Sequence, residues 1–167
     1  TWALPSSLGF GCEESAGASL LRRDGSVWTT DKDGLVPALL SAEISARLGR
    51  DPAQSYAQLT QELGTPFADR VEAAATPEQK TKLAKLSPNQ IHSDRLAGEK
   101  IEQVLDHAPG NNAAIGGIKA IAESGWFAAR PSGTEAIDKI YAESFKSQQH
   151  LQDILKEAQR ITHAAIA

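Results

Sequence analysis

A short turn near the end of the chain carries the residue types needed to hold a phosphate group. An apolar strand precedes this turn, whose sequence is Arg130-Pro131-Ser132-Gly133-Thr134. The guanidinium of Arg130 can donate to two oxygens of one phosphate, and the hydroxyls of Ser132 and Thr134 add two further donors. Gly133 is expected to adopt a positive φ, so that successive backbone N–H groups face one anion. Because Pro, Ser and Gly also form ordinary turns, an exposed hairpin turn is the alternative interpretation.

A second group of candidate ligands lies near the start of the chain, in Glu13-Glu14-Ser15. Two carboxylates beside a hydroxyl can accept hydrogen bonds from the hydroxyls of a neutral polyol. The same side chains could act as general acid and base or as metal ligands. A solvated acidic loop is the simplest alternative, because carboxylates are usually exposed.

A third candidate is the polar stretch that ends in Asp31-Lys32-Asp33-Gly34. Its two aspartates are similar to the opening of a calcium-binding loop, but the third acidic position and the closing glutamate are absent. We interpret Asp33 as the cap of a following helix and Lys32 as a cation near the N-terminus of that helix, where both are available to an anion. An ordinary surface lysine is the alternative.

The composition argues against several classes of protein. The 167 residues carry a net charge of −4, which argues against a nucleic-acid-binding surface. No apolar run is long enough to span a membrane, and the single cysteine, Cys12, leaves no internal disulfide and no cysteine metal site. We therefore expect a reducing, cytoplasmic setting. The chain contains no methionine, even at position 1, which indicates a piece of a longer protein.

Two other patterns are rejected as sites. The four histidines show no metalloprotease spacing, and we treat them as surface or structural residues. The stretch 110–119 is rich in glycine but lacks the glycine spacing and the Lys-Ser/Thr pair of a phosphate-cradling loop. Its glycines are expected to serve a turn and a strand bend.

The elements of the first half are predicted to be mainly helical after a hairpin that turns at Asp24-Gly25. One helix should begin at Asp33 and end at Gly49, with apolar residues on one face. A second should begin at Asp51-Pro52 and end at Gly64, with three apolar residues facing inward. The expected apolar positions are Leu35, Val36, Leu39, Leu40, Ile44 and Leu48 in the first helix, and Tyr56, Leu59 and Leu63 in the second.

Thr65-Pro66 reads as a linker, and we place a domain boundary there, dividing the chain into residues 1–65 and 66–167. The second part is predicted to be α+β with an antiparallel sheet flanked by helices. A capping box at Thr76-Pro77-Glu78-Gln79 should open a helix that runs to about Leu86, followed by loop or irregular structure over 87–98. The predicted strands cover 67–75, 101–108, 115–122, 126–130 and 139–145, and a closing helix from about His150 should bury Leu151, Ile154, Leu155, Ala158 and Ile161.

Three loops in this order resemble those of the bacterial phosphoglucomutases, which belong to the α-D-phosphohexomutase family. They are Phe10-Gly11-Cys12-Glu13-Glu14-Ser15-Ala16-Gly17, Thr30-Asp31-Lys32-Asp33-Gly34, and Trp126-Phe127-Ala128-Ala129-Arg130-Pro131-Ser132-Gly133-Thr134-Glu135. The resemblance covers the whole chain. It implies that the chain is a C-terminal fragment: the C-terminal part of an α/β third domain, which binds sugar, followed by a fourth domain, which binds phosphate.

The same resemblance implies a role for each candidate residue. Glu13 and Ser15 fill the positions that grip two ring hydroxyls of the sugar, and Lys32 matches a lysine near the reacting phosphate, which gives it an auxiliary catalytic role. The phosphate that is not reacting would be held by Arg130, Ser132, Gly133 and Thr134. Cys12 departs from the glycine usual at its position, and its larger side chain could narrow the sugar loop.

By this resemblance, the parent enzyme interconverts glucose 1-phosphate and glucose 6-phosphate through glucose 1,6-bisphosphate, which acts as intermediate and activator. The family's phosphoserine and its magnesium site lie in earlier domains, so we expect the isolated chain to bind no metal and to be inactive. Its expected partners are a hexose phosphate and the N-terminal domains of the same polypeptide. The alternatives are a related phosphomannomutase or phosphoglucosamine mutase, or a non-catalytic phosphosugar-binding module.

Overall fold

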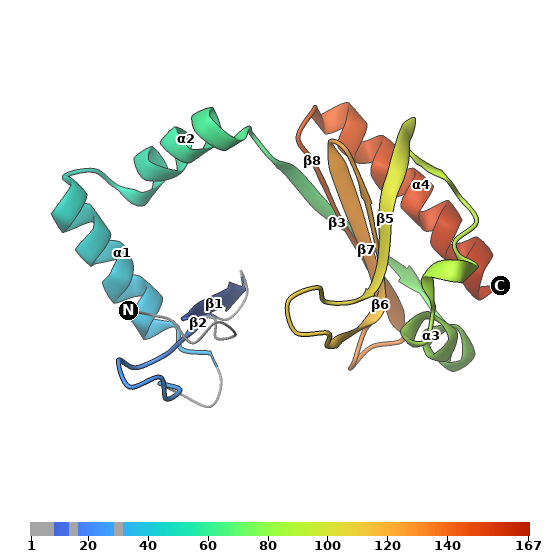
Figure 1. The fold of residues 1–167 in the computed structure, drawn as a ribbon, viewed down its shortest axis with the longest axis horizontal. Coiled ribbons are helices and arrows are strands. Elements are labelled where there is room, and N and C mark those ends of the chain that lie inside the picture. The colour runs from blue at the N-terminus through green and yellow to red at the C-terminus, as the bar shows by residue number, and fades with distance from the viewer. Residues whose placement is uncertain (1–8, 14–16, 29–31) are drawn as a thin grey trace. The chain divides into compact units, whose positions relative to one another are not determined.

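A computed structural model of the chain describes residues 9–13, 17–28 and 32–167 (Figure 1). The chain divides into two compact units, Thr1–Leu63 and Gly64–Ala167. Across both units the described elements mix helices with antiparallel strands, which confirms the predicted α+β class. Within the described residues, no helix has the length and apolar character that a membrane span requires.

The first unit contains a two-stranded antiparallel sheet of β1 (Phe10–Glu13) and β2 (Gly17–Leu20), followed by α1 (Leu35–Leu48) and α2 (Pro52–Leu63). Between β2 and α1 the chain turns back at Asp24-Gly25, as predicted. Gly25 has a φ of +84°, and an antiparallel bridge joins Leu21 to Val27 on either side of the turn. Glycine suits this position because a side chain disfavours positive φ.

Side chains at the helix starts explain why α1 and α2 begin where they do. The Oδ1 atom of Asp33 accepts the backbone N–H groups of Leu35 at 2.7 Å and Val36 at 3.2 Å. Asp51 Oδ1 accepts the N–H of Gln54 at 2.8 Å in the same way. Each carboxylate therefore satisfies donors that the first turn of a helix leaves without a partner.

The side chains predicted to face inward from the second helix, Tyr56, Leu59 and Leu63, are exposed, so that expectation is wrong. The apolar face predicted for the first helix is not buried either. Of the described residues, none in α1 or α2 is buried. Leu35 is 77% exposed, Leu39 71% and Leu63 74%. The helical spacing is correct, but an apolar stripe is buried only where another element covers it. Among the described elements of this unit, α1 packs on β2 and α2, yet Leu35, Leu39, Leu40 and Leu48 remain exposed.

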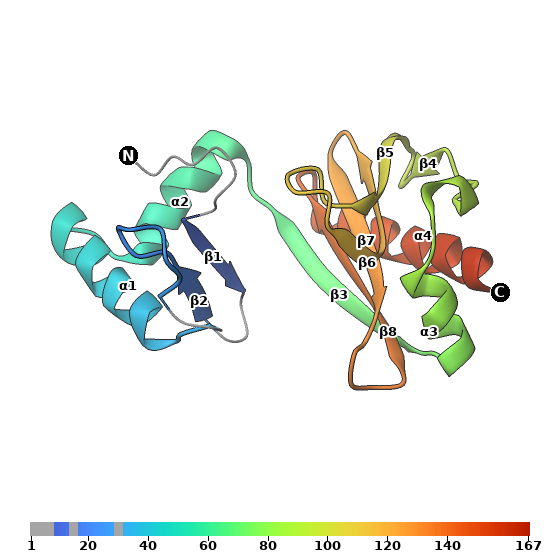
Figure 2. The same ribbon diagram turned by 60° about the horizontal axis from the view of Figure 1, so that its bottom comes forward.

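The second unit is built on a six-stranded antiparallel sheet with the strand order β3-β8-β7-β6-β5-β4. The helices α3 and α4 pack on one face of this sheet (Figure 2). The elements are β3 (Phe67–Ala74), α3 (Pro77–Ala84), the 3-10 helix η1 (Pro88–Gln90), β4 (Arg95–Leu96), β5 (Glu99–His107), β6 (Ala114–Ala122), β7 (Gly125–Pro131), β8 (Ile137–Ser144) and α4 (Gln148–Ile166).

The core of this unit lies between the sheet and the two helices. Phe127 of β7, Ile118 of β6 and Ile140 of β8 pack there against α3 and α4. Each fully buried Leu, Ile or Phe contributes roughly 1.5–3 kcal/mol. All five residues predicted to be buried in the last helix are buried. The predicted strand 139–145 corresponds to β8, along which half-exposed and buried positions alternate.

The segment 87–98 is more ordered than the predicted loop. Leu96 is fully buried, and β4 pairs with β5 through a tight turn at Ala97-Gly98, where both residues have positive φ. A strand of two residues is too short to leave an alternating pattern, so its position could not be predicted. The preceding helix α3 begins at the predicted capping box of Thr76 and Gln79 and ends at Ala84.

Candidate functional site

The loop 132–136 joins β7 to β8 and contains three of the predicted phosphate ligands. The N–H of Ser132 donates to the carbonyl of Ile137 at 2.9 Å, which closes the loop at its base. The Oγ atom of Ser132 accepts the N–H of Glu135 at 3.3 Å, and the residue is 7% exposed. Thr134 is exposed. Ser132 thus shapes the loop, whereas the hydroxyl of Thr134 is accessible to a ligand.

Gly133 has a different role from the one predicted. It is not among the glycines that have positive φ in the described part of the chain, so the prediction of a left-handed conformation is wrong. A Cβ atom placed on Gly133 would meet nothing within 4 Å. The missing side chain therefore leaves the backbone of the loop open to an approaching group.

Arg130 lies on the face of the sheet that α3 and α4 do not cover. Its neighbours in the strand, Phe127 and Ala129, are buried against the helices, and Arg130 is exposed. The guanidinium carbon lies 5.7 Å from the centre of the Tyr141 ring. A guanidinium over an aromatic ring gains a cation–π attraction, so Tyr141 restrains the position of Arg130.

Lys139 is a cation beside Arg130 that the sequence analysis did not identify. The antiparallel register places Lys139 opposite Arg130 on one side and opposite Glu72 on the other. Its Nζ atom lies 3.5 Å from a carboxylate oxygen of Glu72 and 3.5 Å from one of Glu135. The register of the β7–β8 hairpin was the signal that could have identified it, because cross-strand partners share a face.

Gly117 of β6 permits the close approach of β7 just before Arg130. A Cβ atom on Gly117 would lie 2.1 Å from the carbonyl oxygen of Ala129 and 3.0 Å from the Cβ of Arg130. Gly116, directly before it, has a φ of +69°. Both positions need glycine, in agreement with the prediction that glycines of this stretch serve a strand bend.

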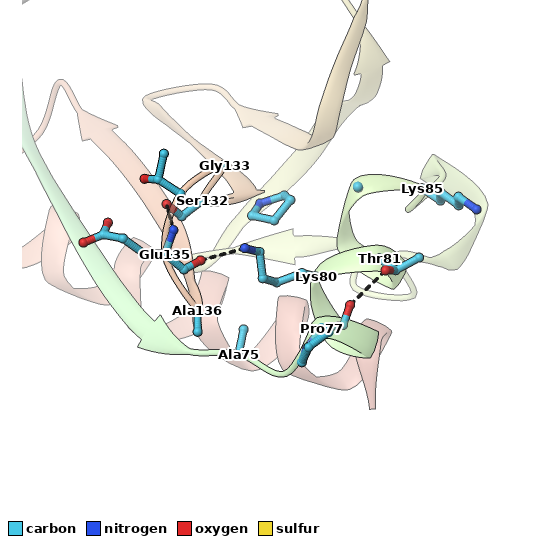
Figure 3. Close-up of a pocket in the computed structure, with 12 residues that line it drawn as sticks. Ala75, Pro77, Lys80, Thr81, Lys85, Ser132, Gly133, Glu135 and Ala136 are labelled. Atoms are coloured by element: carbon cyan, nitrogen blue, oxygen red, sulfur yellow. Dashed lines mark hydrogen bonds between the residues drawn. The ribbon is translucent and has the colours of Figure 1, made fainter.

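A groove of about 660 Å³ separates the loop from α3 (Figure 3). Ser132, Gly133 and Thr134 line one side, and the other is lined by Lys80 and Thr81 of α3 and by Lys85 directly after it. The Nζ atom of Lys80 donates to the backbone carbonyl of Glu135 at 2.6 Å, as Figure 3 shows. Arg130 is not among the groove residues, so the predicted ligands are divided between the groove and the uncovered face of the sheet.

Asp138 is a buried carboxylate at the start of β8, directly after the loop. It is 4% exposed, and its Oδ1 atom is one of the buried side-chain oxygens without a hydrogen-bond partner among the described residues. Burial raises the pKa of this carboxyl group, while the charges of His163 and Lys80 act in the opposite direction. A charge buried this way destabilises the fold.

The remaining predicted residues belong to the first unit. Glu13 ends β1, Ser15 lies outside the described residues, and Lys32 is exposed. Gly17 has a φ of +100°, and a Cβ atom there would lie 2.5 Å from the carbonyl oxygen of Asp33. Ala18 and Asp33 exchange two backbone hydrogen bonds, at 3.1 and 2.8 Å. The start of β2 and Asp33, which follows Lys32, therefore lie side by side.

Cys12, the residue that departs from the family's glycine, lies in β1 opposite Ala18 and has an exposed side chain. Within residues 9–13, 17–28 and 32–167, no group of three or more His, Cys, Asp and Glu side chains could hold a metal ion. The described residues thus provide no ligand set for the magnesium that the resemblance implies, and we assign none of them to it.

Comparisons with known proteins identify the family to which this chain belongs. Residues 4–63 match the model of phosphoglucomutase/phosphomannomutase alpha/beta/alpha domain III, and residues 70–161 match that of the phosphoglucomutase/phosphomannomutase C-terminal domain. A curated phosphoglucomutase from Komagataeibacter xylinus is 59% identical over 161 residues, which are 96% of this chain and 29% of that protein. A solved phosphoglucomutase/phosphomannomutase family protein from Burkholderia thailandensis shares the fold with a TM-score of 0.54 at 20% identity, over 89% of this chain and 26% of its own. The chain belongs to the phosphoglucomutase/phosphomannomutase family, of which it carries domain III residues and the C-terminal domain.

Proposed function

We propose that the chain is the C-terminal, substrate-binding portion of a phosphoglucomutase that interconverts glucose 1-phosphate and glucose 6-phosphate through glucose 1,6-bisphosphate. The proposal is supported by 59% identity to a phosphoglucomutase across nearly the whole chain. Because the chain spans 29% of the length of that relative, the activity belongs to a longer polypeptide. The proposed parent is an isomerase that works as an intramolecular phosphotransferase in the cytoplasm.

The observation that carries the proposal is the arrangement of donors at the end of the β7–β8 hairpin. Thr134 and Gly133 are exposed in the loop, and Arg130 and Lys139 are neighbours across the two strands. In the proposed site, Arg130, Ser132, Gly133 and Thr134 hold the phosphate that is not reacting. Each hydrogen bond to a charged phosphate contributes roughly 1.5–3 kcal/mol.

The first unit would recognise the sugar itself. In the proposed site, the carboxylate of Glu13 accepts a hydrogen bond from one ring hydroxyl, and the hydroxyl of Ser15 bonds to another. Lys32 lies near the reacting phosphate as an auxiliary cation. Glucose 1-phosphate and glucose 6-phosphate present similar hydroxyls and one distal phosphate in their two orientations. Binding these shared groups positions either end of the sugar for phosphoryl transfer, which is how distant contacts accelerate a reaction.

The chain alone is proposed to be inactive. The phosphoryl donor and the magnesium of the parent enzyme belong to domains outside this chain. Magnesium, when bound there, would neutralise charge on the transferred phosphoryl group. The residues of this chain would bind and orient the hexose phosphate, and these are functions that can be measured without turnover.

The experiment that tests the phosphate role is calorimetric titration of the 167-residue chain with glucose 6-phosphate. We expect Arg130→Ala to weaken binding by about 1–3 kcal/mol, because it removes a charge-assisted contact. Arg160→Ala is the matched control, since Arg160 is an exposed arginine of α4 paired with Glu157 at 2.9 Å. Equal affinities for the wild type and Arg130→Ala would refute the assignment of the phosphate loop.

A related sugar specificity is the second candidate, because the matching family models describe both phosphoglucomutases and phosphomannomutases. The two sugars differ at one ring hydroxyl, so the discrimination depends on few contacts. Turnover of glucose 1-phosphate, mannose 1-phosphate and glucosamine 1-phosphate by the complete polypeptide would decide between them. A preference for glucose of less than about tenfold, the range of one weak polar contact, would contradict the proposed specificity.

A further inference from the structure

Lys80 makes a bond whose purpose the proposed function does not explain. Its ammonium group leaves α3, crosses to the loop 132–136, and donates to the backbone carbonyl of Glu135 at 2.6 Å (Figure 3). The side chain also lines the groove together with Ser132, Gly133 and Thr134. A lysine that bonds to a loop backbone fixes the path of that loop as well as adding positive charge to it.

The helix that carries Lys80 is held firmly in place. The capping box between Thr76 and Gln79 fixes its first turn, and the N–H of Lys80 donates to the carbonyl of Thr76 at 3.0 Å. Leu83 and Leu86, on and just after this helix, are buried in the core beneath the sheet. Because these contacts hold the backbone of Lys80 in place, its side chain can restrain the loop.

The loop itself needs such a restraint. Its ends are tied by the bond from Ser132 to Ile137 and by the bond from the N–H of Ala75 to the carbonyl of Ala136 at 3.0 Å. Between these ties, residues 133–135 are exposed. The carboxylate of Glu135 forms an ion pair with Lys139, with 3.5 Å between Oε2 and Nζ. The backbone carbonyl of Glu135 accepts the hydrogen bond from Lys80 on the groove side. The two lysines together orient the peptide groups next to Thr134.

We propose that Lys80 is a positioning residue for the phosphate-binding loop: its bond to the Glu135 carbonyl holds the loop 132–136 in the conformation that receives the phosphate of a sugar phosphate. This inference rests on the proposed function, and it adds to the site a residue from α3, a helix outside the β7–β8 hairpin. Without the bond, the loop would have to be ordered when the ligand binds, and that ordering would reduce the affinity.

The test is a titration of the isotopically labelled 167-residue chain with glucose 6-phosphate, followed by the amide signals of Gly133 and Thr134. We expect Lys80→Met to weaken binding roughly 3- to 10-fold, as for the loss of one exposed hydrogen bond, and Lys80→Arg to restore it to within about twofold. Lys82→Met is the matched control. Lys82 is on the same helix but is not among the groove residues, and its Nζ atom donates to the carbonyl of Ala167 at 2.7 Å.

Two readouts, together with the control variant Lys82→Met, separate positioning from a general effect on the fold. The indole N–H signal of Trp126, which donates to Glu143 at 2.8 Å, reports whether each variant is folded; Lys80→Gln replaces Lys80→Met if that signal is lost. Binding of unphosphorylated glucose should not change, because the loop contacts only the phosphate. An equal loss in Lys82→Met, or an equal loss for glucose, would overturn the inference.

The outcome also distinguishes this inference from the proposed function. If Arg130→Ala weakens binding of glucose 6-phosphate and Lys80→Met does not, the proposed phosphate loop stands and the role of Lys80 is refuted. If neither variant changes the affinity, the phosphate loop is wrongly assigned and both conclusions fall together. Arginine at position 80 can still donate a hydrogen bond. If Lys80→Arg does not restore the affinity that Lys80→Met has lost, the inference that Lys80 acts through a donated hydrogen bond is contradicted.

Discussion

Replacing Gly117 with alanine is expected to disrupt the sheet at the point where Arg130 is anchored. The added Cβ atom would lie 2.1 Å from the carbonyl oxygen of Ala129, well inside the 3.4 Å at which ordinary contact begins. The obstructing atom belongs to the backbone of β7, so no side-chain rotation can relieve the clash. The pairing of β6 with β7 begins at the next residue, Ile118 opposite Ala129, and those strands would have to move apart.

The expected loss of stability follows from this geometry. Forcing extra atoms into a packed region destabilises proteins by about 1–3 kcal/mol, and a backbone clash belongs at the upper end of that range. We therefore expect Gly117→Ala to lower the free energy of unfolding of the second unit by about 2–3 kcal/mol. The Cβ of Arg130 lies 3.0 Å from the added atom, so binding of glucose 6-phosphate should weaken as well.

Urea unfolding followed by the fluorescence of Trp126 would measure the change, in a background where Trp2 and Trp28 are replaced by phenylalanine. Trp126 lies in β7 and pairs with Ile121 of β6, so its signal reports on the affected strands. Gly110→Ala is the matched control, because a Cβ on Gly110 would meet nothing within 4 Å, and it should change the stability by less than about 0.5 kcal/mol. Indistinguishable stabilities for the two variants would refute the close approach at Gly117.

Two further predictions concern buried carboxylates with shifted pKa values, each measured by urea unfolding at pH 3 and pH 7. Burial raises the folded-state pKa of Asp138 above 3.8, so its stabilising contribution is complete below that pH and is lost as the pH rises through the folded pKa. Between pH 3 and pH 7, the stability of Asp138→Asn should therefore rise by roughly 1 kcal/mol relative to that of the wild type. The prediction fails if the difference in stability between the two proteins stays the same at both pH values, or if it changes in favour of the wild type. Burial acts to raise the pKa of Glu99, but hydrogen bonds from Lys146 and Ser124 outweigh it and hold the pKa below 4.5. The contribution of Glu99 to the free energy of unfolding is therefore present above pH 4.5 and is lost as the pH falls through its lower folded pKa. Glu99→Gln should lower the free energy of unfolding by about 1–2 kcal/mol at pH 7 and by less at pH 3. A loss of stability that does not depend on pH would refute this account.

Much of the second unit could be predicted from the sequence because its signals are local. The capping box of Thr76 and Gln79 predicted the start of α3, and alternation along β8 placed Ile140 and Ala142 on one face, which is the buried one. The apolar spacing of α4 identified five of its seven buried residues; Thr162 and Ile166 were not among those predicted. Each of these features depends on residues within a few positions of one another, where propensity and periodicity are informative.

The parts of the site that depend on distant residues could not be predicted in the same way. Lys80 reaches Glu135 across 55 positions of sequence, and Lys139 joins Arg130 only through the register of the hairpin. The conformation expected of Gly133 was wrong because glycine permits positive φ without requiring it. The helical spacing of Leu39 was correct, but periodicity does not say which element, if any, covers a face.

The edge strand β3 limits where the chain can be cut if the second unit is to be prepared alone. β3 pairs with β8 along its whole length, from Phe67 opposite Ser144 to Ala74 opposite Ile137, and it closes one edge of the sheet. In a shortened protein that begins at Thr76, the hydrogen-bonding groups of β8 that pair with β3 would be open to other molecules. Such open edges recruit strands from neighbouring chains. The eight residues of β3 therefore protect the second unit from self-association, and any excised form must retain them.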